Sequence, residues 1–147
     1  MSKLKFLVIN GPNLNMLGIR EPSIYGDFTY HMLCDFIQKK ADDMKIETCF
    51  FQSNHEGDII DKIHEAYQKF DGIVINPGAF THYSYAIFDA LKAVAIPTAE
   101  VHISDVNERE EFRKISVVRP ACCVTVSGKG YNGYIEAIAE LAQKLTN

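Results

Sequence analysis

Several signatures of function are missing from this 147-residue sequence. It has no excess of positive charge, because 15 Lys and Arg stand against 19 Asp and Glu and the formal net charge is −4. Nothing therefore indicates a nucleic acid or an anionic membrane as partner. No apolar run approaches the ~20 residues of a membrane span, and the first one, residues 6–9, is too short for a secretory segment. We therefore expect a cytoplasmic protein.

Metal and redox motifs are also missing. The four cysteines Cys34, Cys49, Cys122 and Cys123 form no CxxC pair, and no histidine or carboxylate cluster has metal-ligand spacing. Gly128, Gly130 and Gly133 do spell GxGxxG, but only 14 residues follow Gly133, too few for the next strand and acidic residue of a dinucleotide site. We expect a tight turn at these glycines, and neither metal nor cofactor.

What is present is the composition of an ordinary globular domain, with 47% hydrophobic and 23% charged residues. The length favours a single domain over residues 1–147. Short apolar runs alternate with amphipathic stretches, which is typical of βα units around a parallel sheet. The expected strands are 4–9, 46–51, 72–75, 97–103 and 122–126. The expected helices are 29–44, one after a capping box of Ser53 and Glu56, 86–94, a short charged one near 107–114, and 132–145.

Five such units predict a flavodoxin-like α/β fold, an open parallel five-stranded sheet in the order 2-1-3-4-5 with helices on both faces. Ligands of such sheets bind beyond the carboxyl ends of strands one and three. Polar side chains gather at three adjacent strand ends, with a weaker set after strand two. They are Asn10, Asn13, Asn15, Arg20, Glu21 and Tyr25, then Asn76, Thr81, His82 and Tyr83, then Glu100, His102 and Ser104, and the weaker Ser53, Asn54 and His55.

Strand four breaks the apolar pattern of a central strand, because Glu100, His102 and Ser104 alternate with apolar residues and share one face. A buried histidine is more often structural. The alternation at a carboxyl end reverses that preference, since Glu100 can orient the imidazole and keep it protonated. We interpret His102 as an acid or base.

The loop from Asn10 to Gly26 has 17 residues, against about 2–6 in a usual βα connection. Such loops are often lids or binding loops. It carries Arg20 and Tyr25, and a guanidinium near a phenol favours the phenolate. Taken alone, Tyr25 as a packing anchor and Arg20 as a partner of Glu21 remain the simpler alternatives.

Other residues have two readings as well. His82 either bonds the loop backbone or contacts a substrate beside Asn76 and Gly78. Arg109 and Arg113 share a charged helical face, from which at least one can reach the crevice. No lysine occurs in loops 10–26, 76–84 or 100–105, which argues against an imine mechanism.

Four segments in order, NGPNLNMLGIREPSIYG (10–26), NPGAFTHYS (76–84), EVHIS (100–104) and the final GxGxxGY (128–134), resemble the type II 3-dehydroquinate dehydratases over essentially the whole chain. The resemblance implies a cofactor-free hydro-lyase, usually a dodecamer of trimers. It would convert 3-dehydroquinate to 3-dehydroshikimate by anti elimination through an enolate, in the shikimate pathway of aromatic amino acid biosynthesis or in quinate breakdown.

The resemblance also implies roles for residues. Tyr25 is the base, Arg20 lowers its pKa, Asn13 holds a water or the enolate oxygen, and His102, oriented by Glu100, is the acid. The substrate carboxylate sits on the N–H groups of Ile103 and Ser104, its hydroxyls on Asn76, His82 and Arg113, and Asp89 reaches a neighbouring subunit's site.

The chain departs from the family pattern at two places. Asp105 stands where the family often has Asn, and its charge would weaken carboxylate binding unless it points outward. Segment 116–128 differs in detail, and we expect it to lie away from the acid and base. Two other functions on this fold fit less well. A flavin or phosphate module needs a hydroxyl- and glycine-rich loop after strand one, and a phosphoacceptor domain needs acidic residues at Asn10 and Asn76.

Overall fold

The computed structural model describes residues 3–19, 27–105 and 109–147. Five parallel strands form one sheet in the order β2-β1-β3-β4-β5, which confirms the predicted fold and strand order. The strands are β1 Lys5–Asn10, β2 Glu47–Gln52, β3 Gly72–Asn76, β4 Thr98–His102 and β5 Val124–Ser127. The α-helices are α2 Tyr30–Asp43, α3 Glu56–Glu65, α4 Tyr85–Val94 and α5 Asn132–Thr146. The 3-10 helices are η1 Leu14–Met16, η2 Gly78–His82, η4 Glu111–Lys114 and η5 Arg119–Ala121.

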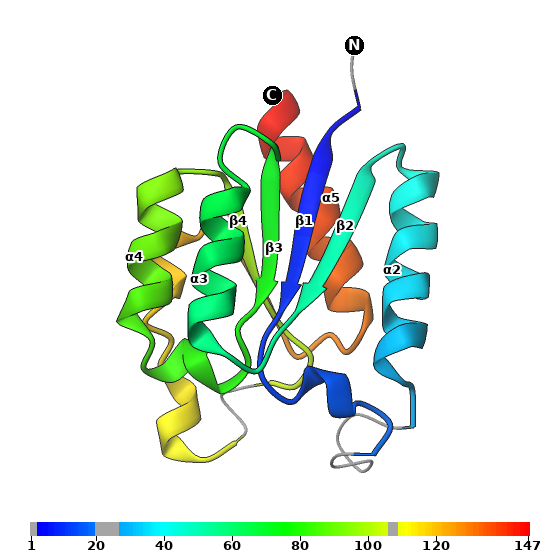
Figure 1. Cartoon of the computed structure of the whole chain (residues 1–147). Coiled ribbons are helices and arrows are strands. Elements are labelled where there is room, and N and C mark those ends of the chain that lie inside the picture. Colours follow the sequence, from blue (N-terminus) through cyan, green and yellow to red (C-terminus); the bar gives the residue numbers. More distant parts are fainter. Residues whose placement is uncertain (1–2, 20–26, 106–108) are drawn as a thin grey trace.

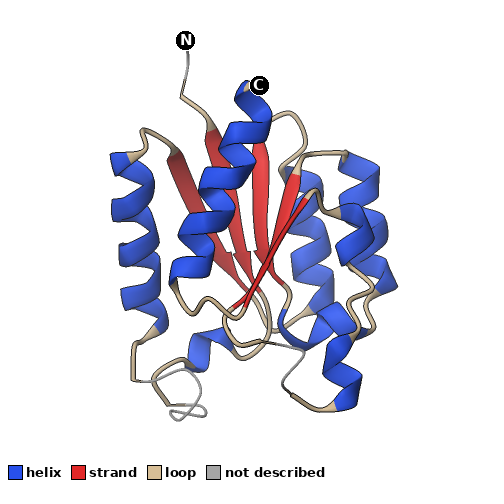
Figure 2. Cartoon of the chain, turned by 180° about the vertical axis from the view of Figure 1, so that it is seen from behind, coloured by secondary structure: helices blue, strands red, loops and turns tan. Residues whose placement is uncertain are grey.

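Helices cover both faces of the sheet (Figure 1). One apolar cluster joins the sheet to α2 and α5, and a second joins it to α3 and α4. Seen from behind, α5 lies across the face opposite α3 and α4 (Figure 2). Strands β3 and β4 are buried along their whole length because they are covered on both sides. Among the described residues, no helix has the length and apolarity needed to cross a bilayer.

Local chemistry explains where two helices begin. The Thr29 hydroxyl accepts a hydrogen bond from the Met32 N–H at 3.1 Å, and the Ser84 hydroxyl accepts one from the Ile87 N–H at 3.1 Å. Each caps a backbone donor that has no partner within its helix. The predicted helix boundaries at these two places therefore hold to within a residue.

The predicted capping box of Ser53 and Glu56 is wrong. Helix α3 begins at Glu56 after an N-cap residue, His55, whose side chain caps nothing. The Ser53 hydroxyl instead bonds Asp58 at 3.1 Å, and Glu56 accepts a hydrogen bond from Ser84 at 2.5 Å. Glu56 therefore links the starts of α3 and α4 instead of capping its own helix.

Two connections have local structure of their own. The first loop contains the turn η1, formed by Leu14–Met16. The charged segment predicted as a helix near 107–114 is a 3-10 helix over Glu111–Lys114 within the described residues. Both turns lie at the edge to which all strand arrowheads point, where η1 is blue and η4 is yellow in Figure 1. The sheet therefore delivers its loops and strand ends to one edge.

Candidate active site

A cavity opens at the carboxyl edge of the sheet, as the strand order predicts. It is partly open to solvent and is lined by both polar and apolar groups. The lining residues are Pro12, Asn13, Leu14, Asn76, Gly78, Ala79, His82, His102, Ile103, Ser104, Arg109 and Arg113. They come from the ends of β1, β3 and β4 and from η4, so segments far apart in sequence form one pocket.

The floor of the cavity is a close crossing of two loops. The Gly11 N–H donates to the Asn76 carbonyl at 2.8 Å, and a Cβ on Gly11 would lie 2.5 Å from the Pro77 carbonyl oxygen. Gly78 has a φ of +61°, and a Cβ there would lie 3.1 Å from the Pro12 carbonyl oxygen. Only glycine fits these two positions without moving backbone. The crossing fixes Asn76 relative to the first loop.

Asn13 is held in place from β2, which the sequence interpretation placed outside the site. Its backbone adopts a φ of 71°, which Asn tolerates better than most residues, and its N–H donates to Asn54 Oδ1 at 2.9 Å. Gln52 Nε2 donates to the same oxygen at 3.2 Å and to the Gly11 carbonyl at 3.1 Å. The end of β2 therefore supports the loop that carries Asn13, a role that sequence reasoning missed.

His102 and Glu100 form a buried pair, as the alternation in strand four predicts. His102 Nε2 lies 2.5 Å from Glu100 Oε2, and Glu100 is fully buried. Because the carboxylate occupies Nε2, Nδ1 is the ring nitrogen left to serve the cavity. The arrangement matches a histidine that is oriented by a carboxylate and exchanges a proton with a ligand.

Two hydroxyls complete the surroundings of Glu100. Thr81 Oγ1 donates to Oε2 at 2.6 Å, and Ser116 Oγ lies 3.0 and 2.9 Å from the two carboxylate oxygens. Burial raises the pKa of Glu100, but the hydrogen bonds from His102, Thr81 and Ser116 outweigh it and hold the pKa below its ordinary value. The expectation that segment 116–128 lies away from the acid and base is wrong at both ends, because Ser116 contacts Glu100 and the Gly128 N–H donates to the His102 carbonyl.

The first of the two interpretations of His82, a bond to loop backbone, is confirmed, and the side chain also lines the cavity. Its Nδ1 lies 2.7 Å from the Ile115 carbonyl oxygen, which can only accept, so Nδ1 carries the hydrogen. Burial lowers the pKa of His82, and the nearby His102 adds to the shift, although the Ile115 carbonyl opposes it. A neutral His82 that lines the cavity therefore offers Nε2 as a hydrogen-bond acceptor.

Both arginines of the charged segment line the cavity, whereas the sequence indicated only that at least one could reach it. Arg113 Nε donates to Glu110 at 2.7 Å, and Arg109 Nε lies 4.0 Å from the same carboxylate. Arg113 also stacks over the Phe112 ring at 4.8 Å. The two guanidinium groups bring positive charge to this wall of a net acidic protein, and Glu110 offsets part of it.

The backbone beyond β4 is shaped by the glycine-rich segment. The Gly128 N–H donates to the His102 carbonyl at 3.3 Å, and the Gly130 N–H donates to the Ile103 carbonyl at 3.0 Å. Both glycines have positive φ, which confirms the predicted tight turn. Asp105 packs against Gly128 and is not among the lining residues described above. The turn binds the carbonyl groups of His102 and Ile103 and so fixes the backbone that follows β4 beside the cavity.

Of the remaining predicted residues, Asp89 is exposed on α4 and does not line the cavity. Arg20 and Tyr25 lie outside the described residues.

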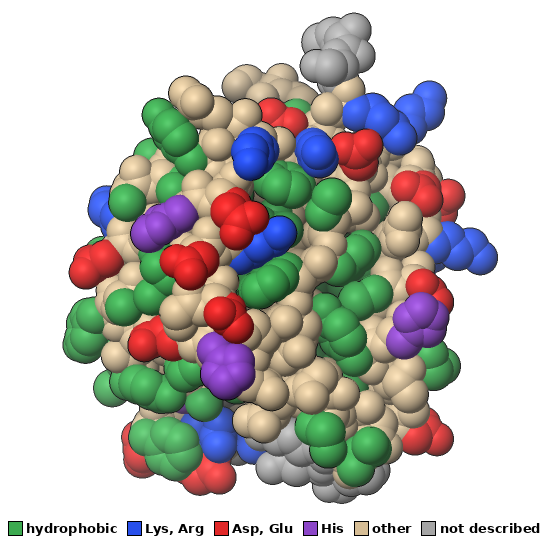
Figure 3. All heavy atoms as spheres, in the orientation of Figure 1, with side chains coloured by type: hydrophobic (Ala, Val, Ile, Leu, Met, Phe, Trp, Pro, Cys, Tyr) green, Lys and Arg blue, Asp and Glu red, His purple; other side chains and the backbone are tan. Residues whose placement is uncertain are grey.

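Figure 3 shows acidic, basic and hydrophobic side chains interspersed over the α3 and α4 face, without a large basic patch on that side. A carboxylate-paired histidine, two arginines and two amides around one crevice are typical of an enzyme site for a small, oxygen-rich anion.

Comparison with known proteins identifies the enzyme family. Residues 4–142 match the family described as dehydroquinase class II. A 3-dehydroquinate dehydratase of Caldicellulosiruptor saccharolyticus is 61% identical over 142 residues, which are 96% of this chain and 98% of the relative. A crystal structure of a type II dehydroquinase from Butyrivibrio crossotus is 59% identical, covers 97% of this chain and 99% of its own, and superimposes with a TM-score of 0.94. The type II dehydroquinase from Propionibacterium acnes is 38% identical over 99% of this chain, with a TM-score of 0.89. The chain belongs to the class II dehydroquinase family.

Proposed function

We propose that this dehydroquinase removes water from 3-dehydroquinate by anti elimination through an enolate, with Tyr25 as base and His102 as acid. The dehydration follows from family membership, because the curated relatives are 3-dehydroquinate dehydratases. The assignment of the acid rests on one observation, the buried His102–Glu100 pair at the cavity wall. The product is 3-dehydroshikimate.

The acid step uses His102. Its Nε2 is engaged by Glu100, so the proton for the departing hydroxyl comes from Nδ1. An ionised Glu100 holds the imidazole ring at one angle during the step. Breaking the carbon–oxygen bond while that proton is delivered releases water rather than hydroxide, which is a far poorer leaving group. A positioned acid of this kind contributes about 10²–10⁴-fold to a rate.

The base step uses Tyr25, assisted by Arg20 and Asn13. A phenol with an ordinary pKa of about 10 is a weak base at neutral pH, and a guanidinium beside it favours the phenolate. Tyr25 takes the proton from the carbon next to the ketone, and the negative charge passes to the enolate oxygen. Asn13, which lines the cavity, stabilises that oxygen directly or through a water. In each turnover Tyr25 gains one proton and His102 loses one, so the enzyme takes up no net proton.

Substrate binding divides between backbone and side chains. The N–H groups of Ile103 and Ser104 lie just beyond β4 and take the carboxylate, with the arginine wall supplying positive potential. Asn76, His82 and Arg113 take the hydroxyls. The neutral His82 described above accepts from a hydroxyl, whereas Arg113 can only donate. The pocket therefore recognises both the negative charge of the substrate and the positions of the hydroxyl groups on its ring.

Assembly belongs to the same proposal. We expect a homododecamer built from trimers, in which Asp89 of one subunit contacts the site of another. Exposed aromatic side chains on the same side of the chain, Tyr83 and Tyr85 at the start of α4 and Phe112 on η4, supply apolar surface for such contacts. The setting is the cytoplasm, in the shikimate pathway or in quinate breakdown.

The test follows the ultraviolet absorbance of the conjugated product after 3-dehydroquinate is added to purified protein. Tyr25→Phe and His102→Ala should each lower kcat by about 10²–10⁴-fold with the fold retained by circular dichroism. Tyr67→Phe and His64→Ala remove the same groups from exposed positions near the end of α3 and should leave kcat unchanged. Activity retained in Tyr25→Phe or His102→Ala would refute the assigned role. Borohydride with substrate should not inactivate the enzyme, since no imine forms.

A further inference from the structure

Three polar side chains form a buried chain of hydrogen bonds beneath the cavity. Asn76 Nδ2 lies 3.0 Å from the Tyr134 hydroxyl, which lies 2.6 Å from Asn10 Oδ1. Asn10 and Tyr134 are fully buried, and Asn76 is 4% exposed. Asn10 and Asn76 are register partners at the ends of β1 and β3, while Tyr134 comes from α5. Only Asn76 of the three lines the cavity.

The direction of each hydrogen bond follows from one backbone group. The Gly78 N–H lies 3.1 Å from Asn76 Oδ1 and can only donate, so the Asn76 oxygen faces Gly78 and its NH₂ group faces Tyr134. Tyr134 therefore accepts from Asn76. Its single hydrogen is left for Asn10, whose oxygen accepts it. The order of donors is Asn76, then Tyr134, with Asn10 as the final acceptor.

We propose that Tyr134 is a positioning residue that, together with the Gly78 N–H, anchors the Asn76 amide so that its NH₂ group donates toward the cavity. One NH₂ hydrogen of Asn76 is used on Tyr134, so the second is what the side chain offers a ligand. The ligand atom opposite Asn76 must then be an acceptor oxygen. The inference rests on the proposed function in one respect, that Asn76 contacts a hydroxyl of the substrate.

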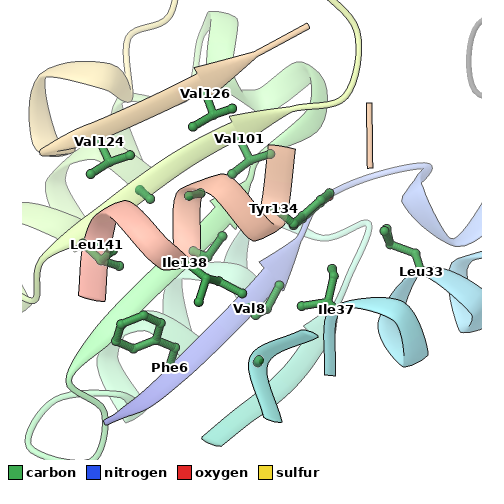
Figure 4. Packing of buried hydrophobic residues seen from close by; sticks show 14 of the residues in the cluster. Phe6, Val8, Leu33, Ile37, Val101, Val124, Val126, Tyr134, Ile138 and Leu141 are labelled. Carbon is green, nitrogen blue, oxygen red and sulfur yellow. The ribbon is translucent and has the colours of Figure 1, made fainter. Parts of the chain in front are cut away.

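The packing of α5 fits this role. Tyr134 lies at the end of the apolar cluster near the carboxyl end of β1, away from Phe6 and Leu141 (Figure 4). A Cβ on the preceding residue, Gly133, would lie 3.4 Å from Val126 Cγ1, so the helix start is pressed against the sheet. The ring is therefore fixed by its neighbours, and the hydroxyl position is set by packing rather than by the ligand.

The test is a double-mutant cycle of Tyr134→Phe and Asn76→Ala, measured with 3-dehydroquinate. Tyr134→Phe should raise KM about tenfold and change kcat less than about threefold, because a contact made equally in the ground and transition states affects KM alone. The double variant should bind no worse than Asn76→Ala, since in this proposal Tyr134 acts on the substrate through Asn76. Additive effects on KM, or an unchanged KM in Tyr134→Phe, would overturn the proposal.

Ile138→Val is the matched control, because it loosens the same buried part of α5 without removing a hydroxyl. It should leave KM unchanged even where urea unfolding shows a similar loss of stability.

If Tyr134→Phe does not fold, Asn10→Ala tests the chain of hydrogen bonds from its other end. Asn10→Ala removes the oxygen that accepts the Tyr134 hydrogen, so the Tyr134 O–H can turn toward Asn76. The substitution should therefore raise KM when Asn76 is present and leave it unchanged in the Asn76→Ala background. An unchanged KM in Asn10→Ala would overturn the proposal. Tyr25→Phe and His102→Ala report on kcat, so the proposed chemistry can fail while this coupling stands.

Discussion

At the scale of single residues, the buried charge on Glu100 is held by three donors from three different segments. His102 is two residues away, Thr81 comes from η2, and Ser116 follows η4. An isolated carboxylate in such a place would take up a proton. Because the donors lower its pKa instead, Glu100 stays ionised at neutral pH and can orient His102.

The sign of the pH dependence follows. Glu100 has a lower pKa in the folded chain than its ordinary 4.5, so its stabilising effect is complete above about pH 4.5 and is lost as the pH falls through the folded value. Ser116→Ala removes a donor to the carboxylate and should cost about 1–3 kcal/mol at pH 7. That cost should shrink below pH 4.5, and the acid limb of kcat/KM should move to higher pH.

Urea unfolding from pH 3 to 7, at one protein concentration, measures this difference. Thr98→Val is the control, because the buried Thr98 hydroxyl donates to the neutral Ile96 carbonyl at 2.8 Å. Its cost should not vary with pH. A Ser116→Ala cost that is equally flat would show that Ser116 does not act on the charge of Glu100.

Much of this site was predictable residue by residue, and the exceptions have a common cause. Glu100 and His102 were found because a period of two along a strand is a local signal. Ser116 follows a 3-10 turn, and Tyr134 sits 58 residues from Asn76 on an ordinary amphipathic helix face. No periodicity marks a hydroxyl as the partner of a distant side chain. Such residues are found only once the sheet has brought them together.

At the scale of elements, the crossing of the loops after β1 and β3 is the tightest contact beneath the cavity. Gly11→Ala would put Cβ 2.5 Å from the Pro77 carbonyl oxygen, and backbone cannot swing away as a side chain would. We expect a cost of about 1–3 kcal/mol from the forced backbone shift, with a fall in kcat/KM because Asn13 and Asn76 lie on the two loops.

The control is Gly57→Ala, in the first turn of α3, where an added Cβ meets nothing within 4 Å. It should stabilise the chain by about 0.4–1 kcal/mol, because alanine restricts the unfolded state more than glycine does. Thermal and urea unfolding compare the two variants. If Gly11→Ala were as stable and active as the parent, the crossing would not be fixing the site.

Elements were predicted more reliably than the contacts at their ends. Within the part of the chain that the structure describes, all five strands and the four α-helices were expected from apolar periodicity, and the strand order followed from the handedness of crossovers. The capping box failed at Ser53 and Glu56, where Asp58 and Ser84 supply other partners. A capping signal weighs only a few neighbouring residues, whereas a carboxylate binds whichever donor the fold brings nearest.

At the scale of the whole molecule, the cavity described above opens on one edge of a single chain, and Asp89 lies outside its lining. A solvent-exposed carboxylate on α4 can take part in catalysis only at a site contributed by another copy. Asp89→Ala should therefore lower kcat/KM about tenfold or more without loss of stability, as expected for a lost hydrogen bond to substrate. Exposed Asp61→Ala on α3 is the matched control and should leave kcat/KM unchanged.

Complementation separates action between copies from action within one. Tyr25→Phe chains and Asp89→Ala chains, unfolded together at equal amounts and refolded, should regain activity that neither variant has alone. Some mixed sites then join a native Tyr25 to a native Asp89 from the neighbour, roughly a quarter of all sites if chains mix at random in a symmetric oligomer. Light scattering on the same sample should give a mass twelve times that of the chain. If Asp89 acted on its own chain's site, every mixed site would lack one of the two groups, and activity would stay at the level of the separate variants.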